Sequence, residues 1–247
     1  MSSNQSMTTL KVIASGGFRA AYQMIVPEFQ RVTGITVMTG AGASQGSSPN
    51  TIGAQLRRGV PADVVVMSRE GIDELIAEGR LVAQSVVDLA TTPTAVAIRA
   101  GAAAPDISST DAFKQMLLNA KSVSFPDSTT GFYLVKTLFP RLGIADAMAV
   151  KCSNKGAAAV ARGEVEIAIR PASELLGVPG LCCVGPLPAE LQFISVFSAA
   201  IVNGSNAMDA AKQLIDWLAL ANHSIALRKA GMERPERRQI APSTSPA

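Results

Sequence analysis

The sequence has 247 residues and a formal net charge of +3, from 22 lysines and arginines against 19 aspartates and glutamates. Apolar residues make up 48% of the chain and charged residues 17%, a balance that excludes an intrinsically disordered protein. Five of the basic residues lie in the last 20 positions and only 4% of the residues are aromatic, so we expect no nucleic-acid partner. No apolar stretch approaches the roughly 18 residues of a membrane span, and we expect no membrane insertion.

Strand-like and helix-like segments alternate along the chain. Apolar runs predict strands at 10–14, 35–38, 63–67, 95–99, 122–125, 166–169 and within 193–202. Amphipathic spacing and punctuation by glycine and proline predict helices at 18–33, 51–58, 69–78, 110–120, 131–142, 156–162 and 207–219. The alternation predicts an α/β fold with doubly wound parallel sheets, and it starts a second time near residue 95, which predicts two lobes.

The expected domain boundaries follow from this repeat. We expect one lobe from residues 9–91 and 197–232, and a second lobe from residues 92–196. Residues 233–247 are rich in proline, serine and arginine, which predicts a flexible tail. The three cysteines, Cys152, Cys182 and Cys183, lack disulfide or zinc spacing, so we expect buried free thiols, and neither a metal nor a cofactor.

The amino terminus reads MSSNQSMTT. It lacks the basic, apolar and small-residue segments of a secretory signal peptide. We therefore expect a cytoplasmic protein if Met1 is the native start, and a periplasmic protein if a leader has been removed.

Three strand-to-helix turns consist of small hydroxyl residues and glycine. Their candidate ligand-binding residues are Ser15, Gly16 and Gly17 in the first turn, Ser47, Ser48 and Thr51 in the second, and Ser128, Thr129, Thr130 and Gly131 in the third. Such turns lie at the carboxyl ends of strands in a doubly wound sheet, where ligands bind. Free backbone N–H groups at a helix start, together with hydroxyls, favour an anion. The alternative is that these residues only cap their helices.

Residues 51–65, TIGAQLRRGVPADVV, resemble a motif of the type II periplasmic solute-binding proteins, nearest to the molybdate-binding group. Further agreement comes from residues 10–15, 28–34, 127–133 and 157–163, so the resemblance covers about residues 9–232. It implies two α/β lobes joined by crossover segments near 91–97 and 191–199, with a ligand enclosed between them by hinge motion. It also implies a monomer with a small anionic ligand, and an ABC transporter permease as a possible partner.

The resemblance implies ligand contacts from Ser15, from a hydroxyl within 47–51, from 128–131 and from the backbone at 156–157. The family's next ligand is a tyrosine, but here Arg170 follows the strand at 166–169. A guanidinium is a planar fork suited to a carboxylate, so Arg170 favours an organic acid. The alternative is a surface ion pair between Arg170 and Glu174 at i+4. Arg19 is a second candidate, with a solvated helix face as its alternative.

Two functions remain open from the sequence. The first is a solute-binding protein for a small anion, either an oxyanion such as molybdate or an organic carboxylate. The second is a cytosolic isomerase of an unsaturated polycarboxylate, because aconitate isomerases share this resemblance and shift a double bond in a tricarboxylate. That reaction needs a base, for which Asp127, Tyr133 and Lys155 are conceivable and none is singled out. His223 is expected away from the three turns.

Overall fold

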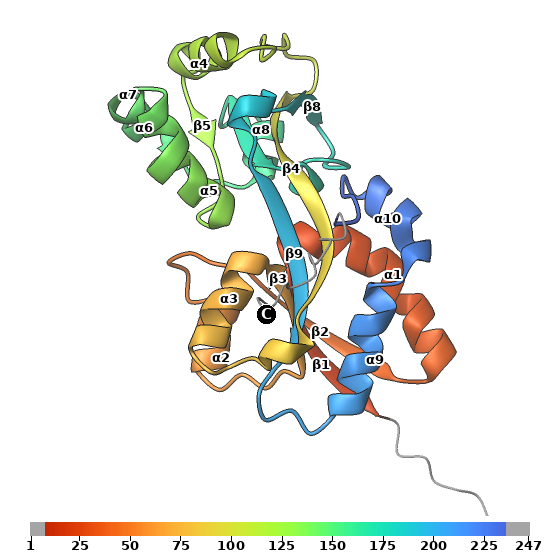
Figure 1. The fold of residues 1–247 in the computed structure, drawn as a ribbon. Coiled ribbons are helices and arrows are strands. Elements are labelled where there is room, and N and C mark those ends of the chain that lie inside the picture. The colour runs from red at the N-terminus through yellow and green to blue at the C-terminus, as the bar shows by residue number, and fades with distance from the viewer. Residues whose placement is uncertain (1–7, 236–247) are drawn as a thin grey trace, which may run out of the picture.

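The computed structural model describes residues 8–235, which form a mixed α/β fold (Figure 1). The strands are β1 (Thr9–Ser15), β2 (Thr36–Gly42), β3 (Val64–Ser68), β4 (Val87–Arg99), β5 (Val123–Ser124), β6 (Cys152–Ser153), β7 (Ile167–Pro171), β8 (Leu181–Pro186) and β9 (Ile194–Ile201). The α-helices are α1 (Arg19–Thr33), α2 (Ile52–Arg57), α3 (Arg69–Ala77), α4 (Thr110–Asn119), α5 (Thr129–Tyr133), α6 (Phe139–Arg141), α7 (Ala145–Ala149), α8 (Ala157–Ala161), α9 (Met208–Leu218) and α10 (Ser224–Lys229).

The strands follow the order β2-β1-β3-β9-β4-β7-β5-β6, and β8 pairs with β4 outside this path. The first part of β4 pairs with β9, and its second part, from Thr94 to Ile98, pairs with β7. Figure 1 accordingly shows two groups of elements joined by β4 and β9. The lower group contains β1, β2, β3, α1, α2, α3, α9 and α10, and the upper group contains β5 to β8 and α4 to α8.

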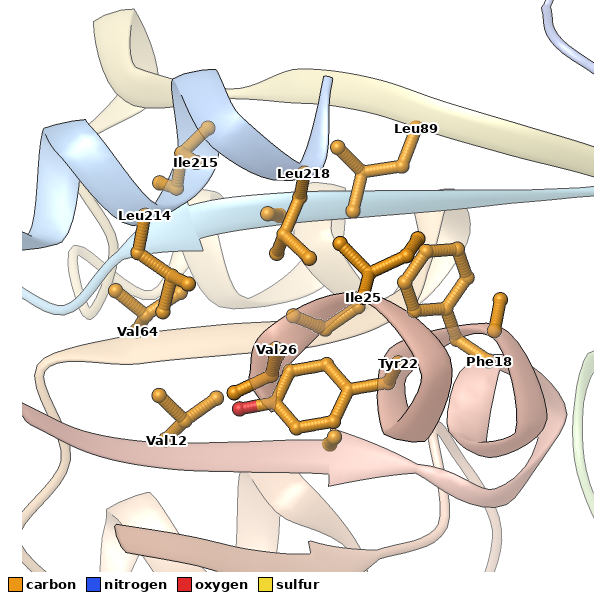
Figure 2. Packing of buried hydrophobic residues seen from close by; sticks show 14 of the residues in the cluster. Val12, Phe18, Tyr22, Ile25, Val26, Val64, Leu89, Leu214, Ile215 and Leu218 are labelled. Atoms are coloured by element: carbon orange, nitrogen blue, oxygen red, sulfur yellow. The ribbon is translucent and has the colours of Figure 1, made fainter. Parts of the chain in front are cut away.

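Alternate residues of the lower strands face opposite sides of the sheet. Val12 and Val64 belong to one apolar cluster, with side chains of α1 and α9 such as Ile25 and Leu214 (Figure 2). Their chain neighbours pack in a different cluster, with side chains of α2 and α3. Because strand side chains alternate between faces, helices cover both sides of this sheet. A strand buried on both faces is apolar throughout, as the run Val64–Val66 is.

The structure extends several of the predicted elements. The predicted strand at 95–99 is the second part of β4, which begins at Val87 and continues through Pro93. Proline is normally found at the edge or the end of a strand. Here Pro93 lies within β4, opposite Ile194 at the end of the β4–β9 pairing. The predicted helix at 131–142 begins at Thr129 and contains a π-helical stretch, Leu134–Leu138. β8 was not predicted at all.

Two expectations near the surface need correction or a limit. Cys182 is exposed, and Cys152 and Cys183 are half-buried. The prediction that these thiols are buried was therefore wrong, although all three are free. The predicted tail falls mainly on residues 236–247, outside the described residues. Glu233 exchanges two backbone hydrogen bonds of 2.8 Å with Thr91, so the described fold continues past residue 232.

Within residues 8–235, no helix has the length and apolar character to cross a membrane.

The core predicts the effect of a truncation. Leu214 of α9 is fully buried in the cluster formed with α1 and the sheet, whereas Leu220 is 41% exposed. We expect Leu214→Ala to lower the free energy of unfolding by about 2–5 kcal/mol, because it removes buried methyl groups and leaves a cavity. The matched control, Leu220→Ala, should cost less than about 0.5–1 kcal/mol. Urea unfolding followed by circular dichroism measures both, and equal losses would contradict this description of the core.

Candidate functional site

A cavity of about 1070 Å³ lies between the lower and upper groups. The lower group lines it with the end of β1, the start of α1, residues 41–44 and 47–48, and Ser68 at the end of β3. The upper group lines it with residues 126–130, with 156–157 at the start of α8, and with residues 170–178 that follow β7. The crossing strand β9 adds Ser195 and Phe197. This cavity is called the cleft below.

The first turn brings Ser15 and the start of α1 to the cleft. Ser15 ends β1 and is 2% exposed, and its Oγ has no hydrogen-bond partner among the described residues. Gly17 lies against the ring of Phe197, where a Cβ would collide with the ring. Only glycine therefore lets the chain turn into the helix at this point. The result is a helix start with an unpaired hydroxyl beside it, which favours an anion in the cleft.

The second and third turns touch each other at one side of the cleft. Asp127 Oδ2 accepts hydrogen bonds from the Ser47 backbone N–H at 3.0 Å and from the Ser47 Oγ at 2.7 Å. These two hydrogen bonds lower the pKa of the Asp127 carboxyl below its ordinary value. The Thr129 hydroxyl donates to Gln45 Oε1 at 2.7 Å and lies 3.0 Å from the Ser68 Oγ. Residues of the lower and upper groups are thus in direct polar contact.

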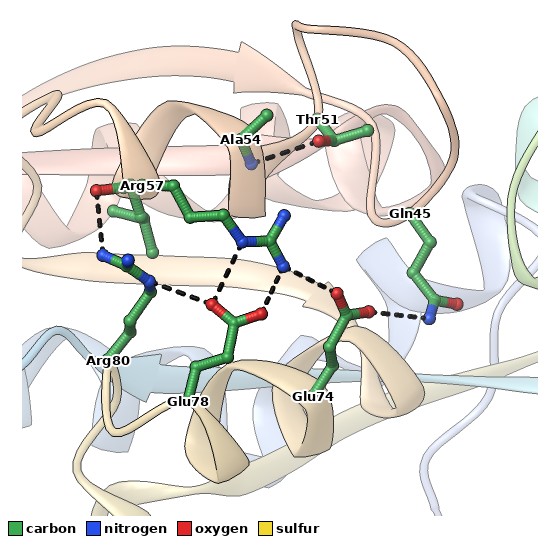
Figure 3. A network of polar contacts seen from close by, with 8 residues as sticks. Gln45, Thr51, Ala54, Arg57, Glu74, Glu78 and Arg80 are labelled. Carbon is green, nitrogen blue, oxygen red and sulfur yellow. Dashed lines mark hydrogen bonds and ion pairs between the residues drawn. The ribbon is translucent and has the colours of Figure 1, made fainter.

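A network of ion pairs between α2 and α3 contacts the loop that carries Ser47 (Figure 3). Arg57 of α2 contacts Glu74 of α3 at 2.7 Å and also pairs with Glu78. Gln45 Nε2 donates to Glu74 Oε2 at 3.3 Å. Exposed ion pairs contribute little stability individually. Here the network links α2 and α3 to the loop, and through Gln45 to Thr129 of the upper group.

Arg170 lies at the upper side of the cleft and is 8% exposed. Its Nη1 donates to Glu174 Oε2 at 2.9 Å and its Nη2 to the Lys155 carbonyl at 3.0 Å. Its Nε is buried without a hydrogen-bond partner in the described part of the chain, as is the Oγ of Ser173. The i+4 ion pair and the position in the cleft therefore exist together, so the two alternatives for Arg170 do not exclude each other.

Most of the ligand-binding residues predicted from the sequence line the cleft. They are Ser15, Gly16, Gly17, Ser47, Ser48, Ser128, Thr129, Thr130 and Arg170. Thr51 and Gly131 do not line it. Thr51 caps α2, with its Oγ1 accepting from the Ala54 N–H at 3.2 Å. Gly131 packs beneath Pro126, where a Cβ would collide with the Pro126 carbonyl oxygen, so it shapes the third turn from behind.

Several polar residues of the cleft were missed by the sequence analysis. They are Ser68, Asn154, Ser173, Glu174 and Ser195. Ser68 stands between a strand and a helix, so the rule applied to the three turns could have found it. Ser195 lies inside β9, 3.5 Å from the Thr130 Oγ1, and nothing in the local sequence marks it. Arg19 does line the cleft, and no contact of its guanidinium is recorded within residues 8–235.

Three of the titratable groups weighed from the sequence lie elsewhere. The Tyr133 hydroxyl donates to the Leu191 carbonyl at 3.0 Å, and its ring stacks on Phe193. The Lys155 Nζ extends to within 4.0 Å of Glu164, away from the cleft lining. His223 packs against Trp217 with ring centroids 5.8 Å apart, as expected outside the cleft, and burial lowers its pKa. Among residues 8–235, the ionisable groups that line the cleft are Arg19, Asp127, Arg170 and Glu174.

Comparison with known proteins gives consistent matches over nearly the whole described chain. An aconitate isomerase from a Pseudomonas species is 37% identical over 233 residues, which is 93% of this chain and 89% of that protein. The periplasmic molybdate-binding protein of Azotobacter vinelandii superposes with a TM-score of 0.71 at 18% identity, covering 92% of this chain and 100% of the other. The sulfate-binding protein SubI of Mycobacterium tuberculosis superposes with a TM-score of 0.69 at 18% identity, covering 93% and 88%.

These structural neighbours share the fold of periplasmic binding proteins, as the resemblance found in the sequence had implied. Residues 10–233 also match the family described as bacterial extracellular solute-binding protein. That match and the 37% identical relative together extend over more than nine-tenths of the chain. The chain therefore belongs to the bacterial extracellular solute-binding protein family.

Proposed function

We propose that this protein is an isomerase that binds an unsaturated polycarboxylate such as aconitate in the cleft and shifts its double bond. The observation that carries the proposal is Arg170, which lies in the cleft with a buried and unpaired Nε. A guanidinium whose other nitrogens are already held is preorganised to bind a carboxylate. The aconitate isomerase that is 37% identical to this chain supports the same reaction.

The cleft offers separate positions for several carboxylates. Arg170 and Ser173 form one group of donors at the upper side. Ser15, the start of α1 and Arg19 form a second group at the lower side. The Ser128 hydroxyl of the third turn offers a third position. A volume of about 1070 Å³ exceeds what a single oxyanion fills, and it leaves room for a tricarboxylate with water.

Proton abstraction beside a carboxylate places negative charge on that carboxylate. Removing a proton from a methylene group next to a double bond gives an allylic carbanion, whose charge spreads into the adjoining carboxylates. Fixed donors aimed at that charge lower the barrier, because they need no reorganisation during the reaction. In this proposal Arg170 both holds the substrate and stabilises the charge that develops on it.

We further propose that the two groups are lobes, with residues 9–91 and 197–232 in one and 92–196 in the other. The continuous ladder of β4 and β9 would be the hinge, since these strands pass between the groups. The contacts of Ser47 with Asp127 and of Thr129 with Ser68 would then form when the lobes close. Closure would exclude water from the bound carbanion.

A solute-binding protein for a small anion is the second candidate function. The family match supports it, as do the molybdate-binding and sulfate-binding structural neighbours. It would place the protein outside the cytoplasm, as a monomer with an ABC transporter permease as partner, whereas an isomerase fits a cytoplasmic location equally well. The two candidates differ in one measurable respect, because a binding protein leaves its ligand chemically unchanged.

The test is to incubate the protein with trans-aconitate and with cis-aconitate and to follow each by proton NMR over hours. We expect conversion of one isomer into the other. Binding of aconitate or of molybdate by calorimetry, with no conversion, would instead support the solute-binding protein. Stabilisation by a ligand, about 2.7 kcal/mol at a hundredfold excess over Kd, makes a true ligand visible in a thermal-shift assay.

Arg170 provides a direct prediction for this activity. Arg170→Gln should lower kcat/KM for aconitate by at least about 30-fold, since a charge-assisted contact is worth about 2 kcal/mol or more. Arg31→Gln is the matched control, because Arg31 is exposed and pairs with Glu28 of the same helix, outside the cleft lining. Its kcat/KM should equal that of the unmodified protein. An equal effect of the two substitutions would contradict the role of Arg170.

Substitutions of Thr51 and Ser15 distinguish a helix-capping role from a ligand-binding role. Thr51→Ala should destabilise the protein by about 1 kcal/mol through the lost helix cap, with KM for aconitate unchanged. Ser15→Ala should raise KM, because the unpaired Oγ at the start of α1 would no longer donate to the ligand. Thermal unfolding and steady-state kinetics measure the two effects. A raised KM in Thr51→Ala alone would reverse the assignment.

A further inference from the structure

The proposed double-bond shift needs a group that removes a proton and returns it elsewhere. Among the residues that line the cleft in the described chain, only Asp127 and Glu174 carry carboxylates. Tyr133 is committed to the Leu191 carbonyl, and Lys155 turns its amine toward Glu164. The choice of base therefore lies between the two carboxylates.

Asp127 is engaged in holding the two groups together. Its Oδ2 accepts two hydrogen bonds from Ser47, and these lower the pKa of the carboxyl. If it moved to take a proton from a substrate, the contact between the second and third turns would be lost. We assign Asp127 to positioning these turns.

Glu174 is held in place without losing its second oxygen. Oε2 accepts from Arg170 at 2.9 Å, and no hydrogen bond to Oε1 is recorded within the described residues. Glu174 ends the single 3₁₀ turn Ala172–Glu174, whose backbone is anchored on β4, where the Ser173 N–H donates to the buried Thr92 Oγ1 at 3.3 Å. The carboxylate is three-quarters buried as a side chain and lines the cleft.

The pairing with Arg170 places Glu174 where the reaction needs a base. A substrate carboxylate bound at the Arg170 Nε would hold its neighbouring carbon close to the guanidinium. Glu174 is in contact with the same guanidinium. The group that stabilises the developing charge is thus next to a group able to accept the proton. A general base must lie within hydrogen-bond reach of the proton that it removes, and of the two cleft carboxylates among the described residues Glu174 is the one that contacts the guanidinium assigned to hold the substrate.

We propose that Glu174 is the catalytic acid–base residue of the isomerisation, an inference that rests on the proposed function above. Its carboxylate takes one proton from the substrate methylene group, and the electron pair of the broken C–H bond enters the allylic system. The double bond moves by one carbon, and the carboxylic acid returns the proton to the former vinyl carbon. No net proton, oxidant or reductant is needed.

The experiment compares Glu174→Gln with the unmodified protein. The glutamine carbonyl still accepts a hydrogen bond from Arg170, but the amide cannot take up a proton from carbon. We expect kcat for aconitate to fall by about 100-fold or more, the usual contribution of general acid–base catalysis, while the Kd of trans-aconitate from calorimetry stays within about threefold. In D₂O, the unmodified protein should exchange the substrate methylene protons and Glu174→Gln should not.

The matched control is Glu28→Gln. Glu28 is exposed on α1 and pairs with Arg31, outside the cleft lining. Its kcat and its deuterium exchange should equal those of the unmodified protein, and circular dichroism should show that both variants fold. Glu174→Asp should recover part of kcat, because the carboxylate is retained one methylene shorter.

The outcomes are distinguishable. If Glu174→Gln keeps its kcat and only its KM or Kd rises, Glu174 positions Arg170 and the inference is overturned. If Glu174→Gln loses conversion and exchange while it still binds trans-aconitate, the inference is supported. If the unmodified protein binds aconitate but neither converts it nor exchanges its protons, the proposed function fails, and the role of Glu174 fails with it.

Discussion

The antiparallel pairing of β4 with β9 is the constraint on which the rest of the structure depends. β4 is shared by the two halves of the sheet, since it pairs with β9 along its first part and with β7 and β8 along its second. The cleft lies beside this crossing, and β9 itself lines it with Ser195. Polar residues more than a hundred positions apart in the chain therefore meet around one cavity.

The cleft favours a negatively charged ligand, although few cationic side chains line it. In the described part of the chain, Arg19 and Arg170 are the positive side chains that line it, and its two carboxylates, Asp127 and Glu174, each accept a hydrogen bond. The remaining attraction comes from helix starts and from buried donors that have no partner in residues 8–235, such as the Ser15 and Ser173 hydroxyls. Leaving a buried donor unpaired costs about 1–3 kcal/mol, so such donors indicate a ligand that completes them.

The same arrangement can bind or catalyse, and a small chemical difference separates the two functions. A binding protein needs donors that hold an anion, whereas an isomerase also needs one group that accepts a proton from carbon. The pairing of Arg170 with Glu174 supplies a candidate for both needs in one place. Fold alone does not distinguish them, and the molybdate-binding and sulfate-binding proteins that superpose on this chain are each 18% identical to it. An aconitate isomerase is 37% identical to this chain over 233 residues.

Local sequence determined the elements and the small-residue turns, because strand and helix periodicity and glycine or hydroxyl punctuation act within a few residues. It predicted the α/β class, the helix α9 and the hydroxyl and glycine residues of the three turns that line part of the cleft. Tertiary structure decided how those turns are used. Thr51 faces its own helix as a cap, and Ser195 reaches the cleft only because β9 crosses the sheet. The environment of Arg170 and Glu174 likewise depends on long-range packing, such as the Ser173 contact with Thr92, which no local pattern encodes.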